Sequence, residues 1–249
     1  MKSSFCGILM VGFFTNSLCV YGIADTTKLK KKESTHWRST ARINTKGFFN
    51  LTGKLVSDNP TFDVNFYYDR KNWGLLIFKA ADLYDHQTAY NFLLTAAYKN
   101  FKLSKKVTVT PYVGTLFEQS EGFADHGSDI ASFLITTVKL NSNLTLEEMS
   151  LFANLIVAPE ERDWANRFRL TYTGKHWDVI STAWWNNQVF DQSSYWTGSV
   201  NIAYSRIKIK EHLFLSIGAT GITTLSTSDR VINPSKQSLM FTIAATMAH

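Results

Sequence analysis

The sequence predicts an all-β protein: a single antiparallel up-and-down transmembrane β-barrel of about twelve strands that follows an N-terminal signal peptide. After residue 36, apolar and polar residues alternate in segments of about ten to fourteen residues, a length that fits tilted membrane-spanning strands. Aromatic residues make up 14% of the chain and charged residues only 18%. This composition is poor in charge for a water-soluble surface and favours a barrel whose outer face meets lipid.

The N-terminus has the pattern of a secretory signal peptide. Lys2 precedes the apolar run Phe5 to Phe14, and the small residues of Gly22-Ile23-Ala24 mark a cleavage site after Ala24. An apolar core of about ten residues is shorter than the roughly 20 that a spanning helix needs. We therefore expect residues 1–24 to be a signal peptide rather than a membrane anchor.

The rest of the chain predicts one domain with a short leader. Residues 25–35 are expected to form a flexible, Lys-rich periplasmic tail, and residues 36–249 the barrel. Four prolines and no Ser/Gly-rich linker give no sign of a domain boundary. Both cysteines, Cys6 and Cys19, lie inside the predicted signal peptide, so no disulfide or cysteine-metal site is expected in the mature chain.

Aromatic residues at both ends of apolar bands indicate membrane interfaces. In the segment Trp164 to Gly174, the even positions are mostly apolar with aromatic ends, and the odd positions include Arg167 and Arg169. Similar alternation at 90–98 and 196–205 predicts further strands. Because aromatic side chains prefer the headgroup level, we expect them at the membrane interfaces. The predicted interface residues are Tyr90, Tyr98, Trp164, Tyr172, Trp196 and Tyr204.

Short and long connections alternate along the chain, as in an up-and-down barrel. Short turns are predicted at 69–72, 103–105, 141–143, 173–176 and 208–211. Longer polar loops are predicted near 57–60, 83–88, 118–128, 157–163, 187–194 and 226–236. These eleven connections imply about twelve strands, of which the first, near 38–56, pairs with the last, 239–247. An even number of strands with short turns on one rim places both termini in the periplasm.

The aromatic-ended strands and alternating connections resemble those of bacterial outer-membrane β-barrels, and the chain is similar to uncharacterised barrels of Bacteroidota. The resemblance covers nearly the whole chain after the predicted signal peptide. It implies a porin-like fold, a Gram-negative outer-membrane location and outer-membrane lipid as a partner. The chain departs from the pattern at its end, Met247-Ala248-His249, where many such proteins have an aromatic residue.

Polar residues opposite the apolar bands are expected to face the barrel lumen. Those predicted to line it are Asp63, Asn65, Lys99, Arg167, Arg169, Asn186 and Asn201. Mixed charges can line a narrow channel for small polar solutes, or they can pair and plug a structural or interaction barrel. Both non-enzymatic hypotheses stay open. In the channel hypothesis, Arg167 and Arg169 predict a preference for anions.

An alternative hypothesis is an acyl-ester hydrolase. His126-Gly127-Ser128 resembles the His-x-Ser of outer-membrane phospholipases and lipid A deacylases, in which histidine activates a serine that attacks the ester. Asp125 or Asp129 would orient the histidine, but the Asn-Gly that follows the pair in those phospholipases is missing here. A polar loop that enters a strand explains the same residues without catalysis.

Other sequence patterns give little support for catalysis or cofactors. Adjacency within a strand would send Glu147 and Glu148 to opposite faces. The six histidines are scattered without metal-ligand spacing, so no metal or cofactor is predicted. The mild positive charge does not indicate nucleic-acid binding, and no protein partner can be named. A soluble secreted β-domain is a further alternative.

Overall fold

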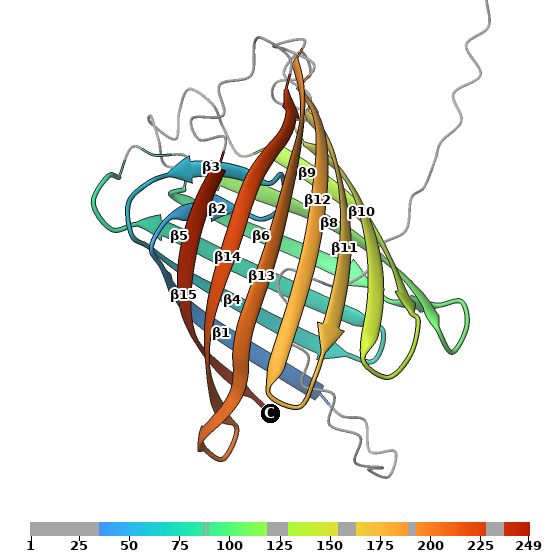
Figure 1. The fold of residues 1–249 in the computed structure, drawn as a ribbon. Coiled ribbons are helices and arrows are strands. Elements are labelled where there is room, and N and C mark those ends of the chain that lie inside the picture. The colour runs from blue at the N-terminus through green and yellow to red at the C-terminus, as the bar shows by residue number, and fades with distance from the viewer. Residues whose placement is uncertain are drawn as a thin grey trace, which may run out of the picture.

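The computed structural model describes residues 35–86, 88, 90–118, 129–153, 163–188, 193–227 and 237–249. Within these residues, one antiparallel sheet contains thirteen strand segments, and a further pairing between β6 and β8 closes it. Because β7 (Phe101–Lys102) continues β6 (Phe92–Lys99) after a one-residue break, the wall is a barrel of twelve strands (Figure 1). The predicted fold class is confirmed.

The strands follow one another around the barrel in chain order. Besides β6 with β7, the wall contains β1 (Thr35–Asn44), β4 (Thr61–Arg70), β5 (Trp73–Asp82), β8 (Val107–Glu118), β9 (Asp129–Lys139), β10 (Leu144–Ala153), β11 (Asp163–Thr173), β12 (Trp177–Gln188), β13 (Ser193–Lys210), β14 (Leu213–Thr227) and β15 (Gln237–Ala248). Pairing of β1 with β15 runs from Arg38–Ala248 to Asn44–Thr242. Closure pairs the first and last strands and leaves no sheet edge unsatisfied in lipid.

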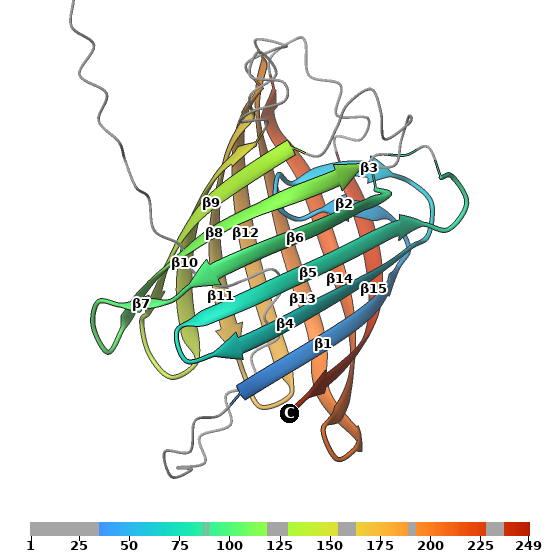
Figure 2. The ribbon, with the colours of Figure 1, turned by 180° about the vertical axis from the view of Figure 1, so that it is seen from behind.

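The short turns gather at one end of the barrel, together with the start of β1 and the C-terminus (Figure 2). Trp37 N donates to His249 O at 3.1 Å, which ties the two chain segments together there. Lys71 and His212 adopt left-handed backbone conformations in tight turns of this end, with φ of 58° and 63°. The predicted alternation of short and long connections therefore agrees with the strand order.

The outer face of the wall is apolar and rich in aromatic rings. Trp164, Tyr172, Trp196 and Tyr204 are all exposed on it. Near the end with the longer connections, a row of rings crosses four strands, with centroids 5.7 Å apart for Phe152–Trp164, 5.4 Å for Trp164–Trp185 and 6.2 Å for Trp185–Trp196. Such a face suits the headgroup and acyl regions of a bilayer. The described residues include no helix that is long and apolar enough to cross a membrane.

The predicted first strand, near 38–56, is wrong beyond residue 44. β1 ends at Asn44, and β2 (Gly47–Phe49) and β3 (Lys54–Ser57) form a separate two-stranded sheet, here called the inner hairpin. Phe49 packs against Phe92 of β6, and Phe48 packs against Trp184 of β12. Contacts with two different walls place the inner hairpin inside the barrel.

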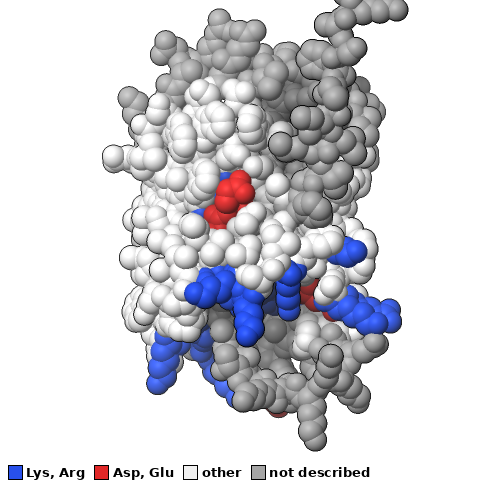
Figure 3. Space-filling view, turned by 90° about the vertical axis from the view of Figure 1, so that its right-hand side faces the viewer, with Lys and Arg blue, Asp and Glu red and all other residues white. Residues whose placement is uncertain are grey.

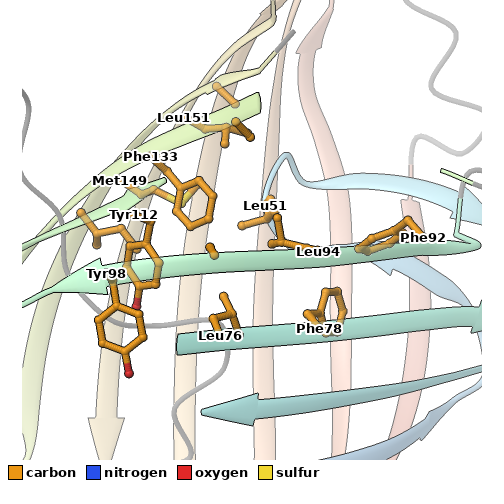
Figure 4. Close-up of a cluster of buried hydrophobic side chains, with 14 of the residues drawn as sticks. Leu51, Leu76, Phe78, Phe92, Leu94, Tyr98, Tyr112, Phe133, Met149 and Leu151 are labelled. Atoms are coloured by element: carbon orange, nitrogen blue, oxygen red, sulfur yellow. The ribbon is translucent and has the colours of Figure 1, made fainter. Parts of the chain in front are cut away.

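The predicted orientation of the 90–98 segment is also wrong. Tyr90, Phe92, Leu94 and Tyr98 are buried, whereas Lys99 lies on the other face of β6. Tyr90 and Tyr98 therefore do not face the membrane interface, and Lys99 does not face the lumen. The inner face of this wall is an apolar core that packs against Leu51 of the inner hairpin, so apolar character here marks the inside (Figure 4).

Gly53 in the tip of the inner hairpin offers a test of this packing. Its φ is +73°, and an added Cβ would lie 2.6 Å from Trp184 Cδ2. We expect Gly53→Ala to destabilise the barrel by at least the roughly 1–2 kcal/mol that a left-handed conformation costs an L-residue. Urea unfolding in lipid vesicles measures the loss. Gly221→Ala is the control, since its added Cβ would meet nothing within 4 Å; equal losses in both variants would contradict the packing.

Candidate functional site in the barrel interior

The tip of the inner hairpin is fixed to the far wall by buried donors. Arg167 Nη1 and Trp184 Nε1 each donate to the backbone carbonyl of Asn50 at 3.1 Å. Arg169 Nη2 donates to Asn50 Oδ1 at 3.0 Å. Alternation places Arg167 and Arg169 on the inner face of β11 and Trp184 on the inner face of β12. Together these bonds hold the tip across the lumen.

A second contact of the tip involves Thr52. Asn186 Nδ2 donates to the Thr52 carbonyl at 2.6 Å, and the Tyr195 hydroxyl approaches the same oxygen at 3.5 Å. On the other side, Leu51 lies in the apolar cluster formed by the inner faces of β4 to β11. The tip is thus polar toward one half of the barrel and apolar toward the other.

The two arginines that hold the tip share one carboxylate. Arg167 Nη2 lies 2.6 Å from Glu147 Oε1, and Arg169 Nη1 lies 3.7 Å from the same oxygen. All three side chains are almost completely buried. Because an unpaired charge inside a protein is costly, Glu147 compensates the arginines that fix the inner hairpin.

A second buried ion pair lies closer to β1. Arg42 Nε donates to Asp63 Oδ1 at 2.6 Å, while Asn44 Nδ2 and the Tyr90 hydroxyl donate to Asp63 Oδ2 at 2.9 and 3.2 Å. Thr242 on β15 donates to Asn44 Oδ1 at 2.8 Å and extends this network across the β1–β15 seam. The carboxylate of Asp63 is therefore held by two donors from β1 and by the Tyr90 hydroxyl.

A cavity of about 70 Å³ lies between the inner hairpin and the polar half of the wall. Its polar lining includes Arg42, Asp63, Arg169, Asn201, Thr220 and Thr242. A cavity of this size holds about five water molecules. The interior is therefore narrow at the level of the inner hairpin, and its lining combines these polar groups with apolar side chains such as Phe48, Ile180 and Met240.

The wall and its interior can be compared with solved structures. The KdgM porin in complex with oligogalacturonate matches with a TM-score of 0.54 at 8% identity, over 85% of this chain and 98% of that chain. The NanC porin matches with a TM-score of 0.51 at 8% identity, over 86% and 99%. An outer membrane channel from Pseudomonas putida F1 matches with 0.52 at 8% identity, over 89% and 97%. The chain has the fold of bacterial outer-membrane porins.

At such low identity, the likeness defines the fold alone. No protein-family model matches the chain, and no curated protein matches it. Whether a solute passes through this barrel therefore depends on its own interior.

The predicted lumen residues fall into two groups in the structure. Asp63, Asn65, Arg167, Arg169 and Asn186 are buried inside the barrel, and Asn201 on β13 lines the cavity. Lys99 is the exception among the predicted residues. Its Nζ lies 4.9 Å from the centroid of the Trp73 ring, which is exposed on the outer face near the short turns.

The residues of the hydrolase hypothesis are outside the described part of the chain. His126 and Ser128 fall between residues 118 and 129, and for Asp129 only its place at the start of β9 is described. The hydrolase hypothesis therefore stays a prediction that the described residues do not test. Among the described residues, no group of three or more His, Cys, Asp or Glu side chains could hold a metal ion.

The functional residues that the sequence did not reveal are those of the inner hairpin and its partners. Asn50 and Thr52 act through backbone carbonyls, which any residue type provides. Arg42 and Glu147 were not predicted to face the lumen. The length of the predicted first strand, 38–56, is no signal of an extra element either, since β13 has 18 residues in the same barrel.

Proposed function

We propose that the protein is a non-enzymatic outer-membrane channel for small polar solutes, narrowed by the inner hairpin. The observation that carries this proposal is the cavity between the hairpin and the wall, which charged and polar side chains line in part. A twelve-stranded barrel lies between eight-stranded barrels that side chains fill and sixteen-stranded barrels that leave an open channel. An inward-folded segment in such a barrel restricts the lumen to a narrow path.

The division of the interior into two halves supports a path rather than a complete plug. Leu51 and its neighbours pack the inner hairpin onto the apolar half. On the other half, Phe48 and Leu55 contact Trp184, Ile222 and Met240. The inner faces of β12 to β15 also carry small polar side chains, among them Thr182, Ser199, Thr220 and Thr242. Hydroxyl and amide groups replace part of the hydration shell of a passing solute, so a polar solute passes on this side.

The charges around the path favour anions weakly. The interior beside the path contains three cations and two anions, which leaves one positive charge in excess. The cations are Arg42, Arg167 and Arg169, and the anions are Asp63 and Glu147. Of the two arginines predicted to select anions, Arg169 lines the cavity, while Arg167 holds the hairpin. We expect small anionic or neutral solutes to pass more readily than cations.

We place the chain in the outer membrane with both termini in the periplasm. The short turns and the C-terminus share one end of the barrel, the arrangement expected for periplasmic termini. Outer-membrane lipid then surrounds the aromatic outer face. Oligogalacturonate is named with the KdgM porin; for this chain the solute class stays small and polar. The similarity to Bacteroidota barrels stays a prediction.

Charge selectivity gives a residue-specific prediction. Arg169→Gln should lower the anion-to-cation permeability ratio, because it removes one of the two cations that line the cavity, the other being Arg42. Reversal potentials across a planar bilayer in a salt gradient measure the ratio. Lys99→Gln is the matched control, since its ammonium lies outside beside Trp73. A ratio that changes in the Lys99 variant and not in the Arg169 variant would contradict the proposed path.

Solute flux tests the proposed function itself. Proteoliposomes with the folded barrel should swell in small neutral or anionic sugars and not in sugars much larger than the cavity. A lipid-hydrolysis assay on the same preparation, with Ser128→Ala beside it, tests the hydrolase alternative. Lipid cleavage that depends on Ser128, or the absence of any solute flux, would replace the channel proposal.

A further inference from the structure

The turn between β7 and β8 carries lysines together with an exposed leucine. Lys102, Lys105 and Lys106 are exposed there, and Leu103 is 70% exposed. The exposed Lys139, which ends β9, lies beside them, because its backbone nitrogen donates to the Lys106 carbonyl at 2.8 Å. These four lysines and Leu103 are here called the basic cluster.

The turn that carries the basic cluster is held by its own hydrogen bonds. The Ser104 hydroxyl accepts from the backbone nitrogens of Lys106 and Val107 at 3.1 and 3.0 Å. The Leu103 nitrogen donates to the Val107 carbonyl at 3.0 Å. Because the backbone is fixed, a ligand of the basic cluster has to order only side chains, which lowers the entropic cost of binding.

The positive charge of the basic cluster is not compensated along its own strands. The stretches 99–117 and 130–146 contain no Asp or Glu. Figure 3 shows Lys and Arg side chains in a row on this side of the molecule, below a wide area in which few side chains are charged. Since like charges held side by side repel each other, an anionic ligand among these lysines is stabilised.

The basic cluster lies where a bilayer around the barrel has its headgroups. Nearby, the Trp73 ring is 58% exposed on the outer face, and Lys99 Nζ lies 4.9 Å from the centroid of this ring. Tryptophan side chains prefer the headgroup level of a membrane. In Figure 2 the turn after β7 stands out from the side of the barrel. The turn therefore projects toward surrounding headgroups.

Exposed aliphatic side chains accompany lysines in two further turns of this end. Leu140, 44% exposed, follows Lys139, and Ile209, 54% exposed, lies between the exposed Lys208 and Lys210. A turn surrounded by water gains no stability from exposed aliphatic groups. At a membrane interface, the aliphatic group reaches the acyl chains while the ammonium groups stay at the phosphate level. This combination favours a lipid over a soluble anion as the ligand.

We propose that the basic cluster binds the headgroups of anionic phospholipids in the leaflet at the short-turn end. The ammonium groups of Lys102, Lys105 and Lys106 donate to phosphate oxygens, while Leu103 packs against the acyl chains. A zwitterionic headgroup has no net charge to balance the cluster, so anionic lipid is preferred. The proposal rests on the placement of the barrel in a membrane and not on a path for solutes.

Lipid retention tests this preference. The folded barrel is reconstituted in equal amounts of phosphatidylglycerol and phosphatidylcholine and released in mild detergent, and native mass spectrometry gives the ratio of the two lipids that stay bound. The wild type should retain phosphatidylglycerol several-fold more. Combined replacement of Lys102, Lys105 and Lys106 by glutamine should remove most of this preference, whereas their replacement by arginine should keep it.

Two further variants separate the basic cluster from general surface charge and a lipid from a soluble anion. Combined replacement of Arg70, Lys71 and Lys175 by glutamine removes three exposed cations from other turns of this end and should keep most of the preference. Leu103→Asn keeps every charge and should still lower the retention of phosphatidylglycerol, because its contact with the acyl chains is lost.

Three results would overturn the proposal. The wild type retains both lipids equally or retains neither, the two triple glutamine variants lose the preference equally, or Leu103→Asn retains as much phosphatidylglycerol as the wild type and inorganic polyphosphate displaces that lipid from both. The last result would identify a soluble anion as the ligand. Conductance does not enter these measurements, so the lipid proposal and the channel proposal fail independently.

Discussion

Removal of the inner hairpin should raise the single-channel conductance several-fold. Replacing residues 47–57 with a short Gly-Ser linker removes Phe48, Leu51 and Leu55 from the lumen, together with the backbone carbonyls that Arg167 and Asn186 bind. The remaining wall keeps its closed ladder of backbone hydrogen bonds, which the hairpin does not join. A wider aqueous lumen is then expected for a twelve-stranded barrel.

The two conductances can be compared only if the wild-type barrel and the shortened barrel are both folded. Heat-dependent mobility on a gel shows whether the shortened barrel is folded, and Glu211→Gln on an exposed turn provides an unrelated variant of unchanged conductance. If the folded, shortened barrel conducts no better than the wild type, the inner hairpin is not the constriction.

Replacement of Glu147 should cause the largest loss of stability of any single charge removal considered. Glu147→Gln leaves the guanidinium groups of Arg167 and Arg169 in the interior without their shared carboxylate. Breaking a buried ion pair by removal of one partner costs about 3–5 kcal/mol. Repulsion between the two arginines should also loosen their hold on Asn50, so the open-channel current should become noisier.

Urea unfolding in lipid vesicles measures the loss of stability of the Glu147→Gln variant as a change in its free energy of unfolding. Glu211→Gln removes a carboxylate from an exposed turn, where such a pair contributes at most about 1 kcal/mol. Losses of similar size in the two variants would mean that Glu147 does not compensate the buried arginines.

Much of the fold could be predicted because it depends on local patterns. Alternation over Trp164 to Gly174 gives the correct outward face, with Trp164 and Tyr172 exposed and Arg167 buried. The pair Trp184-Trp185 likewise divides between the inside and the outside, as neighbours on a strand must. The number of short turns and long loops then gives the number of strands.

The inner hairpin could not be predicted from the same patterns. Its apolar residues Phe48, Leu51 and Leu55 look like more of the first strand, since a segment packed inside a barrel needs the same residues as one that faces lipid. Whether this segment packs inside the barrel or faces lipid depends on hydrogen bonds that Asn50 and Thr52 accept from side chains of distant strands. Such long-range contacts leave no local signal.

The reversed face of β6 has the same origin. An aqueous lumen predicts polar residues inside, but the hairpin turns half of the interior into a core, so Phe92, Leu94 and Tyr98 point inward. The outer face of β6 carries Leu93 and Ala97 beside Thr95 and Lys99, so neither face is clearly polar. When neither face is polar, the period of two still indicates a strand but no longer indicates its orientation.

Single-channel recording from the purified wild-type protein in planar bilayers tests the central claim most directly. A path beside the inner hairpin predicts stable, small conductance steps with a weak preference for anions. A folded barrel that inserts and carries no current would contradict the account, and the mixed charges of the interior would then belong to a plugged structural barrel.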